Sequence, residues 1–101
     1  MAKRPIDFAA LNARLLPALP RLCRLWLPSG RQEGREWVAR NPTRNDRHAG
    51  SFKVNLATGR WADFAIGDRG GDPVSLMAYL DGTSQYEAAL KLQDMLGVRH
   101  D

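Results

Sequence analysis

The chain has 101 residues, of which 44% are hydrophobic and 26% are charged, and its formal net charge is +4. This is the length of one domain with enough apolar residues for a core, so we exclude a second fold and wholesale disorder. The single cysteine, Cys23, excludes an internal disulfide and a zinc site of three or four cysteines, and it favours a reducing cytoplasm. No stretch approaches the roughly 20 apolar residues of a membrane span, so no membrane partner is expected.

The segment at residues 6–27 has apolar residues at steps of three and four, which mark one face of a helix. Pro17 and Pro20 interrupt this pattern, so it predicts two short helices, at about residues 7–16 and 17–27. Three arginines fall on the side away from the leucines, where solvated charges are expected: Arg14, Arg21 and Arg24.

The middle of the chain has the pattern of strands. A short, partly alternating stretch at residues 36–40 predicts one strand, and the almost entirely polar residues 41–50 predict a loop. The clearest strand follows at residues 51–56, and a turn returns the chain along residues 60–64, which predicts a hairpin. The apolar face of its first strand is expected to contain Phe52, Val54 and Leu56.

Two further helices are predicted near the end of the chain. After a glycine-rich connection at residues 66–71, Asp72 is suited to cap a helix over residues 73–80. A capping box that begins at Ser84 opens a last helix, which runs to about Leu96. The expected buried residues of the two helices are Val74, Met77, Leu80, Ala89, Leu92 and Leu96.

These elements predict an α+β fold in a single domain over residues 1–101. A small antiparallel sheet at residues 35–66 is flanked by an N-terminal helical segment at residues 1–28 and a helix pair at residues 72–97.

Charge is unevenly distributed along the chain. Residues 1–50 contain ten Lys or Arg and four acidic residues, whereas residues 51–101 contain five and seven. Twelve of the fifteen basic residues are Arg, whose flat guanidinium matches phosphate and stacks on bases. This excess favours nucleic acid over a membrane surface as the partner, although a GC-rich genome also enriches Arg.

Candidates for catalysis are few. His48 lies in a polar loop and His100 beside the end of the chain, and no nucleophile–base pair suggests itself. Cys23 lies among leucines, where it is expected to pack as a small apolar residue. We therefore expect a non-catalytic protein. A weaker alternative is residual metal binding through Asp63, Asp68 and His48.

Basic and aromatic residues lie on the expected strands or beside them, where they can converge on one side of the sheet. Such a surface is the usual binding platform for single-stranded nucleic acid, because bases stack on the aromatic rings and the cations neutralise the phosphates. The alternative is that Trp37 and Trp61 are core residues. The candidate nucleic-acid-binding residues are Arg40, Arg44, Arg47, Lys53, Arg60, Trp61 and Arg69.

Several motifs follow one another in a recognisable order: Asn-Pro-Thr-Arg at 41–44, Gly-Ser-Phe-Lys-Val at 50–54, Trp-Ala-Asp-Phe-Ala-Ile-Gly at 61–67 and Gly-Gly-Asp at 70–72. Over residues 37–98 this order resembles the N-terminal zinc-ribbon domain of bacterial and phage DNA primases. That family's pattern is Cys-Pro-x-His, a Pro-Ser-Phe-x-Val strand, Cys-Phe-x-Cys-Gly and Gly-Gly-Asp before a helix. The Ser-Phe-x-Val strand and the Gly-Gly-Asp turn are the most specific elements.

The chain departs from the family at the zinc ligands, where it has Asn41, Arg44, Asp63 and Ile66. The resemblance therefore implies a metal-free, degenerate ribbon without a cofactor, as found in some plasmid and phage primase-helicase proteins. Structural zinc contributes about 10 kcal/mol or more to folding in finger peptides, so its loss needs a replacement. We expect Arg44 and Asp63 to meet where the metal stood. Because a surface ion pair is worth only about 0 to 1 kcal/mol, the N-terminal helices must supply most of the replacement.

In primases the ribbon domain acts as a template reader: it binds single-stranded DNA and cooperates with a separate polymerase domain. The resemblance thus implies a single-stranded DNA-binding module in replication or priming, with a primase catalytic domain or a replicative helicase as a further partner. The alternative function is a protein-interaction module that does not bind DNA. It would dock a helicase or another replication protein through its N-terminal amphipathic helices, with Leu22 and Leu25 as contacts.

Overall fold

A computed structural model describes residues 4–44 and 50–97, and these residues fold into an α+β structure with helices on one side of an antiparallel sheet. The helices are α1 (Phe8–Leu15), the short 3-10 helix η1 (Leu16–Ala18), α2 (Leu19–Trp26), α3 (Pro73–Asp81) and α4 (Gln85–Leu96). The strands are β1 (Arg31–Glu33), β2 (Glu36–Ala39), β3 (Phe52–Asn55), β4 (Trp61–Asp63) and β5 (Arg69–Gly70). The expected fold class is confirmed.

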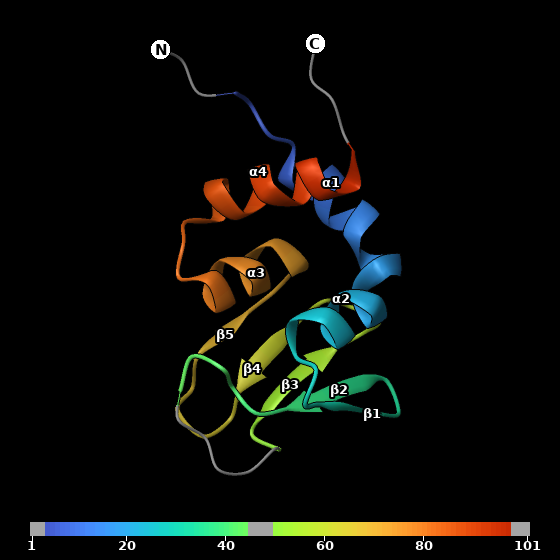
Figure 1. The fold of residues 1–101 in the computed structure, drawn as a ribbon, viewed down its shortest axis with the longest axis vertical. Coiled ribbons are helices and arrows are strands. Elements are labelled where there is room, and N and C mark those ends of the chain that lie inside the picture. The colour runs from blue at the N-terminus through green and yellow to red at the C-terminus, as the bar shows by residue number, and fades with distance from the viewer. Residues whose placement is uncertain (1–3, 45–49, 98–101) are drawn as a thin grey trace.

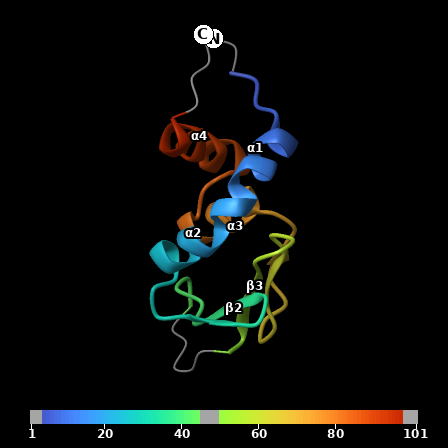
Figure 2. The same cartoon turned by 90° about the vertical axis from the view of Figure 1, so that its right-hand side faces the viewer.

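The sheet has the strand order β1-β2-β3-β4-β5, and every neighbouring pair is antiparallel. Figure 1 shows α2 and α3 next to the sheet, with α1 and α4 beyond them, and the side view in Figure 2 agrees. One buried cluster joins α2 and α3 to the sheet, and a second joins α1, α3 and α4. The core is therefore built in two layers that share α3 and also α2, whose Leu22 belongs to the second cluster.

The N-terminal segment consists of two helices with a 3-10 joint, close to the predicted bounds. Asp7 caps α1 by accepting a hydrogen bond from the Ala10 N–H at 3.0 Å. Pro17 lies in the joint, because proline cannot donate the hydrogen bond that would continue α1, and Pro20 is tolerated in the first turn of α2. The arginines expected in solvent are exposed: Arg14, Arg21 and Arg24. In the described part of the chain, no helix has the length and apolar character needed to cross a membrane.

Residues of the N-terminal helices enter both buried clusters. Leu19 and Cys23 of α2 pack with Phe52 and Val54 of the sheet, whereas Leu15 of α1 packs with the C-terminal helices. The N-terminal segment is thus an integral part of the core.

The predicted helix pair is confirmed as α3 and α4. Asp72 Oδ1 accepts from the Ser75 N–H at 2.8 Å, and Ser84 Oγ accepts from the Glu87 N–H at 3.1 Å, so both predicted N-caps are present. Of the residues of α4 that were expected to be buried, Ala89 and Leu92 are fully buried and Leu96 is half-buried.

The buried residues of α3 differ in part from the predicted set. Val74 is buried as expected, but Met77 and Leu80 are half-buried, and Leu76 and Ala78 are buried in their place. The reason is that α3 packs on two sides. Leu76 faces the sheet cluster, whereas Val74 and Ala78 face the cluster of helices, so α3 has no single apolar stripe.

The predicted hairpin is confirmed as β3 and β4, and the predicted strand at residues 36–40 is confirmed as β2. Phe52 and Val54 are fully buried, as the alternation predicts, and Leu56 is half-buried. The sequence did not predict β1 and β5. β1 contains three exposed polar residues and β5 is a two-residue Arg-Gly strand, so neither has an apolar alternation, and both are defined by pairing with β2 and β4.

Candidate nucleic-acid interface

The register of the sheet separates its residues into two faces, because antiparallel partners share a face and successive residues alternate. On the face covered by the helices, called the helix face below, one row across the strands contains Gln32, Trp37, Val54, Trp61 and Gly70. On the opposite face, called the open face, the neighbouring row contains Arg31, Val38, Lys53, Ala62 and Arg69. The helix face carries the core, since Trp37, Val54 and Trp61 belong to the first buried cluster.

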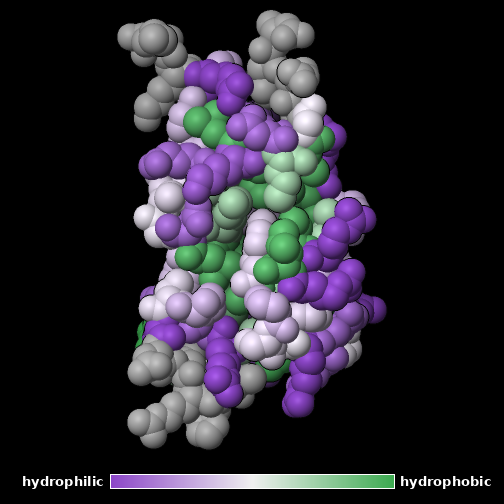
Figure 3. Space-filling model, in the orientation of Figure 1, coloured by the Kyte–Doolittle hydropathy of each residue, from purple (hydrophilic) through white to green (hydrophobic). Residues whose placement is uncertain are grey.

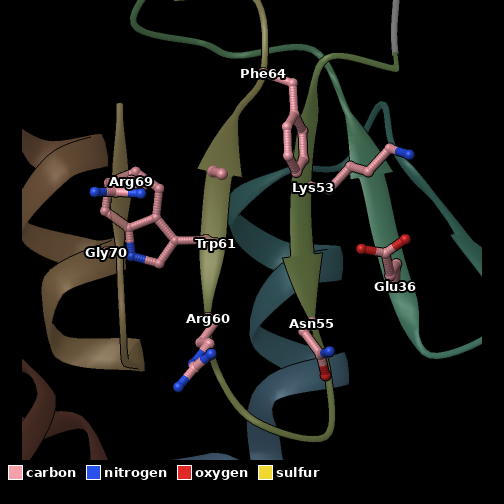
Figure 4. Close-up of a pocket in the computed structure, with 9 residues that line it drawn as sticks. Glu36, Lys53, Asn55, Arg60, Trp61, Phe64, Arg69 and Gly70 are labelled. Atoms are coloured by element: carbon pink, nitrogen blue, oxygen red, sulfur yellow. The ribbon is translucent and has the colours of Figure 1, made fainter. Parts of the chain in front are cut away.

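The open face contains a shallow hollow of about 330 Å³. Its charged lining residues are Lys53, Arg60, Arg69 and Glu36, which give the hollow a net charge of +2. Asn55, Ala62 and Phe64 complete the open-face lining, and Trp61 and Gly70 form part of its wall. In Figure 4 the charged side chains come from four different strands or their ends, and Phe64 lies at one end of the hollow.

Phe64 is the exposed aromatic ring of this hollow, with 71% of its surface accessible to solvent. The Lys53 Nζ atom lies 5.8 Å from the centre of the Phe64 ring, within the range of a cation–π contact. The sequence analysis missed Phe64. The alternation along residues 61–64 carries the signal, because it places Phe64 on the face opposite to Trp61.

Trp61 is a core residue, so the expectation that it offers an open ring to a base is wrong. Its exposed fraction is 5%, and its Nε1 donates a hydrogen bond to Ser75 Oγ at 3.0 Å. Its ring centre lies 4.6 Å from that of Tyr79. Trp37 is buried in the same way, with Nε1 donating to the Leu27 carbonyl oxygen at 3.0 Å. Both tryptophans contribute a large apolar surface to the core of this small protein.

The remaining candidates lie in different places. Lys53, Arg60 and Arg69 come together around the hollow, as expected. Arg40 is exposed directly after β2 but does not line the hollow. Arg44 is half-buried and forms an ion pair with Asp63, so it does not belong to the open face. Three residues named from the sequence, Arg47, His48 and His100, lie outside the described residues.

Asp63 is fully buried on the helix face and is the centre of a polar cluster. Its Oδ2 accepts hydrogen bonds from Asn41 Nδ2 at 2.9 Å and from Arg44 Nε at 3.0 Å, and its Oδ1 accepts from the Ala65 N–H at 2.9 Å. Burial raises the pKa of Asp63, but these hydrogen bonds and the Arg44 charge outweigh burial, so the pKa lies below its ordinary value. The carboxylate is therefore held ionised inside the protein.

The polar cluster extends to Tyr79. Asn41 Nδ2 lies 2.7 Å from the Tyr79 hydroxyl, which in turn donates to Asp68 Oδ2 at 2.7 Å. Arg44 and Asp63 meet as predicted, and Asn41 joins them, whereas Ile66 is 46% exposed. Within residues 4–44 and 50–97, no group of three or more His, Cys, Asp or Glu side chains is placed to hold a metal ion.

Comparison of the chain with protein-family models, with curated proteins and with solved structures finds no match. The resemblance to primase zinc ribbons therefore remains a hypothesis based on the sequence motifs alone. What the geometry adds is an open sheet face with three cations and an exposed phenyl ring around one hollow.

Proposed function

We propose that this protein is a non-catalytic module that binds single-stranded DNA through the open face of its sheet. The observation that carries the proposal is the exposed Phe64 ring beside Lys53, in a hollow that also contains Arg60 and Arg69. This is the combination of ring and cations that single-strand-binding surfaces use: bases stack on the ring, and the cations neutralise the phosphates.

The exposure of Phe64 favours an unpaired strand over a duplex. The bases of a duplex are stacked on one another, so their ring faces are not open to a protein side chain, whereas an unpaired base can lie flat on phenylalanine. Stacking of one base on an aromatic side chain is worth about 1–3 kcal/mol. A phenyl ring that is 71% exposed on a cationic surface has the area for this contact.

The choice of DNA rather than RNA, and of replication or priming as the process, rests on the resemblance to primase ribbons. In that context a primase catalytic domain or a replicative helicase would act beside this module in the cytoplasm. A plasmid or phage primase-helicase system is the setting that the resemblance favours.

The proposal is tested by titrating a fluorescently labelled single-stranded oligonucleotide with the protein at low salt and following anisotropy. We expect binding that weakens steeply as salt increases, and we expect Phe64→Ala to weaken it by about tenfold, which corresponds to about 1.4 kcal/mol of lost stacking. Leu25→Ala is the matched control, because Leu25 is also an exposed apolar residue, at 67%, but lies on α2. Absence of binding at low salt, or equal affinities for both variants, contradicts the proposal.

Docking of another replication protein is the second candidate function. A hollow of about 240 Å³ lies between α2 and α3, lined by Trp26, Pro42, Met77, Leu80 and Asp81. Figure 3, which has the orientation of Figure 1, shows apolar side chains in the middle of the face that it presents. Leu25 is exposed on α2, but Leu22 is 5% exposed and belongs to the core, so the expectation that Leu22 contacts a partner is wrong.

The docking function is tested by capture of a purified replicative helicase on the immobilised protein. Leu25→Lys and Met77→Lys, checked for folding by circular dichroism, would abolish capture, whereas Phe64→Ala would leave it intact. Equal capture by all variants, or no capture by the original chain, contradicts docking at this hollow.

A further inference from the structure

We propose that the bound single strand crosses the open face at right angles to the β-strands, with its phosphates along Arg69, Lys53 and Arg31. This proposal rests on the proposed function and deepens it. It assigns a binding role to Arg31, which the sequence analysis did not name, and it sets the length of strand that the site covers.

The register of the sheet carries the proposal. Arg31 pairs with Val38, which pairs with Lys53. Lys53 pairs with Ala62, which pairs with Arg69. The row thus contains a cation on every second strand of the five. The residues between the cations are the half-buried Ala62 and the buried Val38, which is 5% exposed, so the path follows the cation side chains above them. All members lie on the open face, because partners in an antiparallel sheet share a face.

The spacing of the row defines the length of the site. Neighbouring strands lie about 4.8 Å apart, so cations on alternate strands are about 10 Å apart and the whole row spans roughly 19 Å. A stacked strand advances about 3.4 Å per nucleotide. About six nucleotides therefore cover the row from Arg69 to Arg31.

The neighbouring rows favour this path. On one side of the cation row, Glu33 and Glu36 are paired across β1 and β2, and their carboxylates repel a phosphate backbone. The same row continues through Asn55 of β3 to Arg60 before β4, which attracts phosphates at that end. On the other side lies Phe64, one residue beyond the end of β4 and two residues after Ala62. A DNA strand whose phosphates follow the cations and whose bases point toward Phe64 keeps its phosphates away from the two glutamates and brings its bases to the exposed ring.

Arg31 already has a carboxylate partner, which a phosphate must replace. Its Nε lies 2.7 Å from Glu33 Oε2, but the Arg31 side chain is 80% exposed. An ion pair as exposed as this one is weak. A phosphate can therefore exchange with the Glu33 carboxylate on the Arg31 guanidinium, and loss of the Glu33 charge should strengthen binding.

The test compares variants of the intact chain in anisotropy titrations with labelled oligothymidylates of roughly three and roughly nine nucleotides, at several salt concentrations. For the longer oligonucleotide, Arg31→Ala should reduce the slope of log affinity against log salt by about 0.7, the value for one phosphate contact to a single strand. Arg24→Ala, which removes the same charge from an exposed position on α2, should leave the slope unchanged. Glu33→Gln should increase the affinity.

The two oligonucleotide lengths distinguish a defined path across the sheet from nonspecific attraction between the protein and DNA charges. The short oligonucleotide can occupy the Phe64 end without reaching β1, so Arg31→Ala should affect it less than the long one. If the protein binds DNA but Arg31→Ala matches Arg24→Ala with the long oligonucleotide, the path is wrong and the proposed function stands. If the unmodified chain binds neither oligonucleotide at low salt, the proposed function itself fails.

Discussion

The guanidinium Nε of Arg44 lies 3.0 Å from Oδ2 of Asp63, a carboxylate that has no exposed surface. In the resemblance drawn from the sequence, both residues correspond to zinc ligands of the primase pattern, as does Asn41, which donates to the same Asp63 oxygen. Hydrogen bonds thus join the loop after β2 to the end of β4. The role of Arg44 in this structure is to compensate a buried charge, which differs from the DNA contact expected from the sequence.

Because Asp63 is ionised in the folded protein, we predict that the free energy of unfolding decreases at acidic pH. Because its pKa is lower in the folded protein than its ordinary value, ionised Asp63 stabilises the fold at every pH above the unfolded-state pKa of about 3.9. This contribution is lost as the pH falls from about 4 through the folded-state pKa. Urea denaturation between about pH 7 and pH 3 should show a decreasing free energy of unfolding below about pH 4.

Asp63→Asn is the variant that isolates this effect, and Asp94→Asn, on the exposed surface of α4, is its control. Asp63→Asn should be less stable near neutral pH and should depend less on pH in the acidic range. Equal acid dependence in Asp63→Asn and the original chain would contradict the assignment.

The N-terminal helices should be required for folding. Leu19 is fully buried between α2 and the sheet, so Leu19→Ala should lower the free energy of unfolding by about 2–5 kcal/mol. Leu25→Ala, at an exposed position of the same helix, should change it by less than about 0.5 kcal/mol. Deletion of residues 1–27 should abolish cooperative thermal unfolding. A truncated chain that still melts cooperatively would show that the sheet and C-terminal helices suffice.

The close approach of Trp61 to β5 predicts a strict requirement for glycine at position 70. A Cβ atom added to Gly70 would lie 2.5 Å from Trp61 Nε1 and 2.6 Å from Ser75 Oγ. Gly70→Ala should therefore disrupt the Trp61–Ser75 hydrogen bond and lower the melting temperature. Gly71→Ala is the matched control, since a Cβ there meets no atom within 4 Å. Equal melting temperatures for the two variants would be inconsistent with this packing.

Cys23 should be unreactive in the folded protein. It is fully buried, and burial raises the pKa of its thiol to about 12, so almost no thiolate forms at neutral pH. Labelling with a thiol reagent should be slow in native buffer and fast in denaturant, with a rate that follows the unfolded population. Rapid stoichiometric labelling under native conditions would exclude the observed burial.

The parts of the fold that local sequence patterns encode were predicted from the sequence. The β3–β4 hairpin follows from the strict alternation of β3 and the turn after it, and α3 and α4 follow from the capping residues Asp72 and Ser84. Strands β1 and β5 were not predicted, because they are short and polar and become strands only by pairing with a neighbour. The contact between Arg44 and Asp63 was expected from the resemblance to primase ribbons, and the structure places the two side chains together.

The candidate site was predicted only in part, for a related reason. Charge indicated that Lys53, Arg60 and Arg69 were candidates, whereas Phe64 was not named from the sequence, although alternation along β4 places it opposite to Trp61. The helices cover the Trp61 face through packing between segments that are far apart in the sequence, since Leu19, Cys23 and Leu76 belong to the same buried cluster as Trp61. The alternation of β3 already marks the face of Phe52 and Val54 as apolar, but the register between β3 and β4 puts Trp61 on that face and leaves Phe64 as the exposed ring, and this register is a property of the tertiary structure.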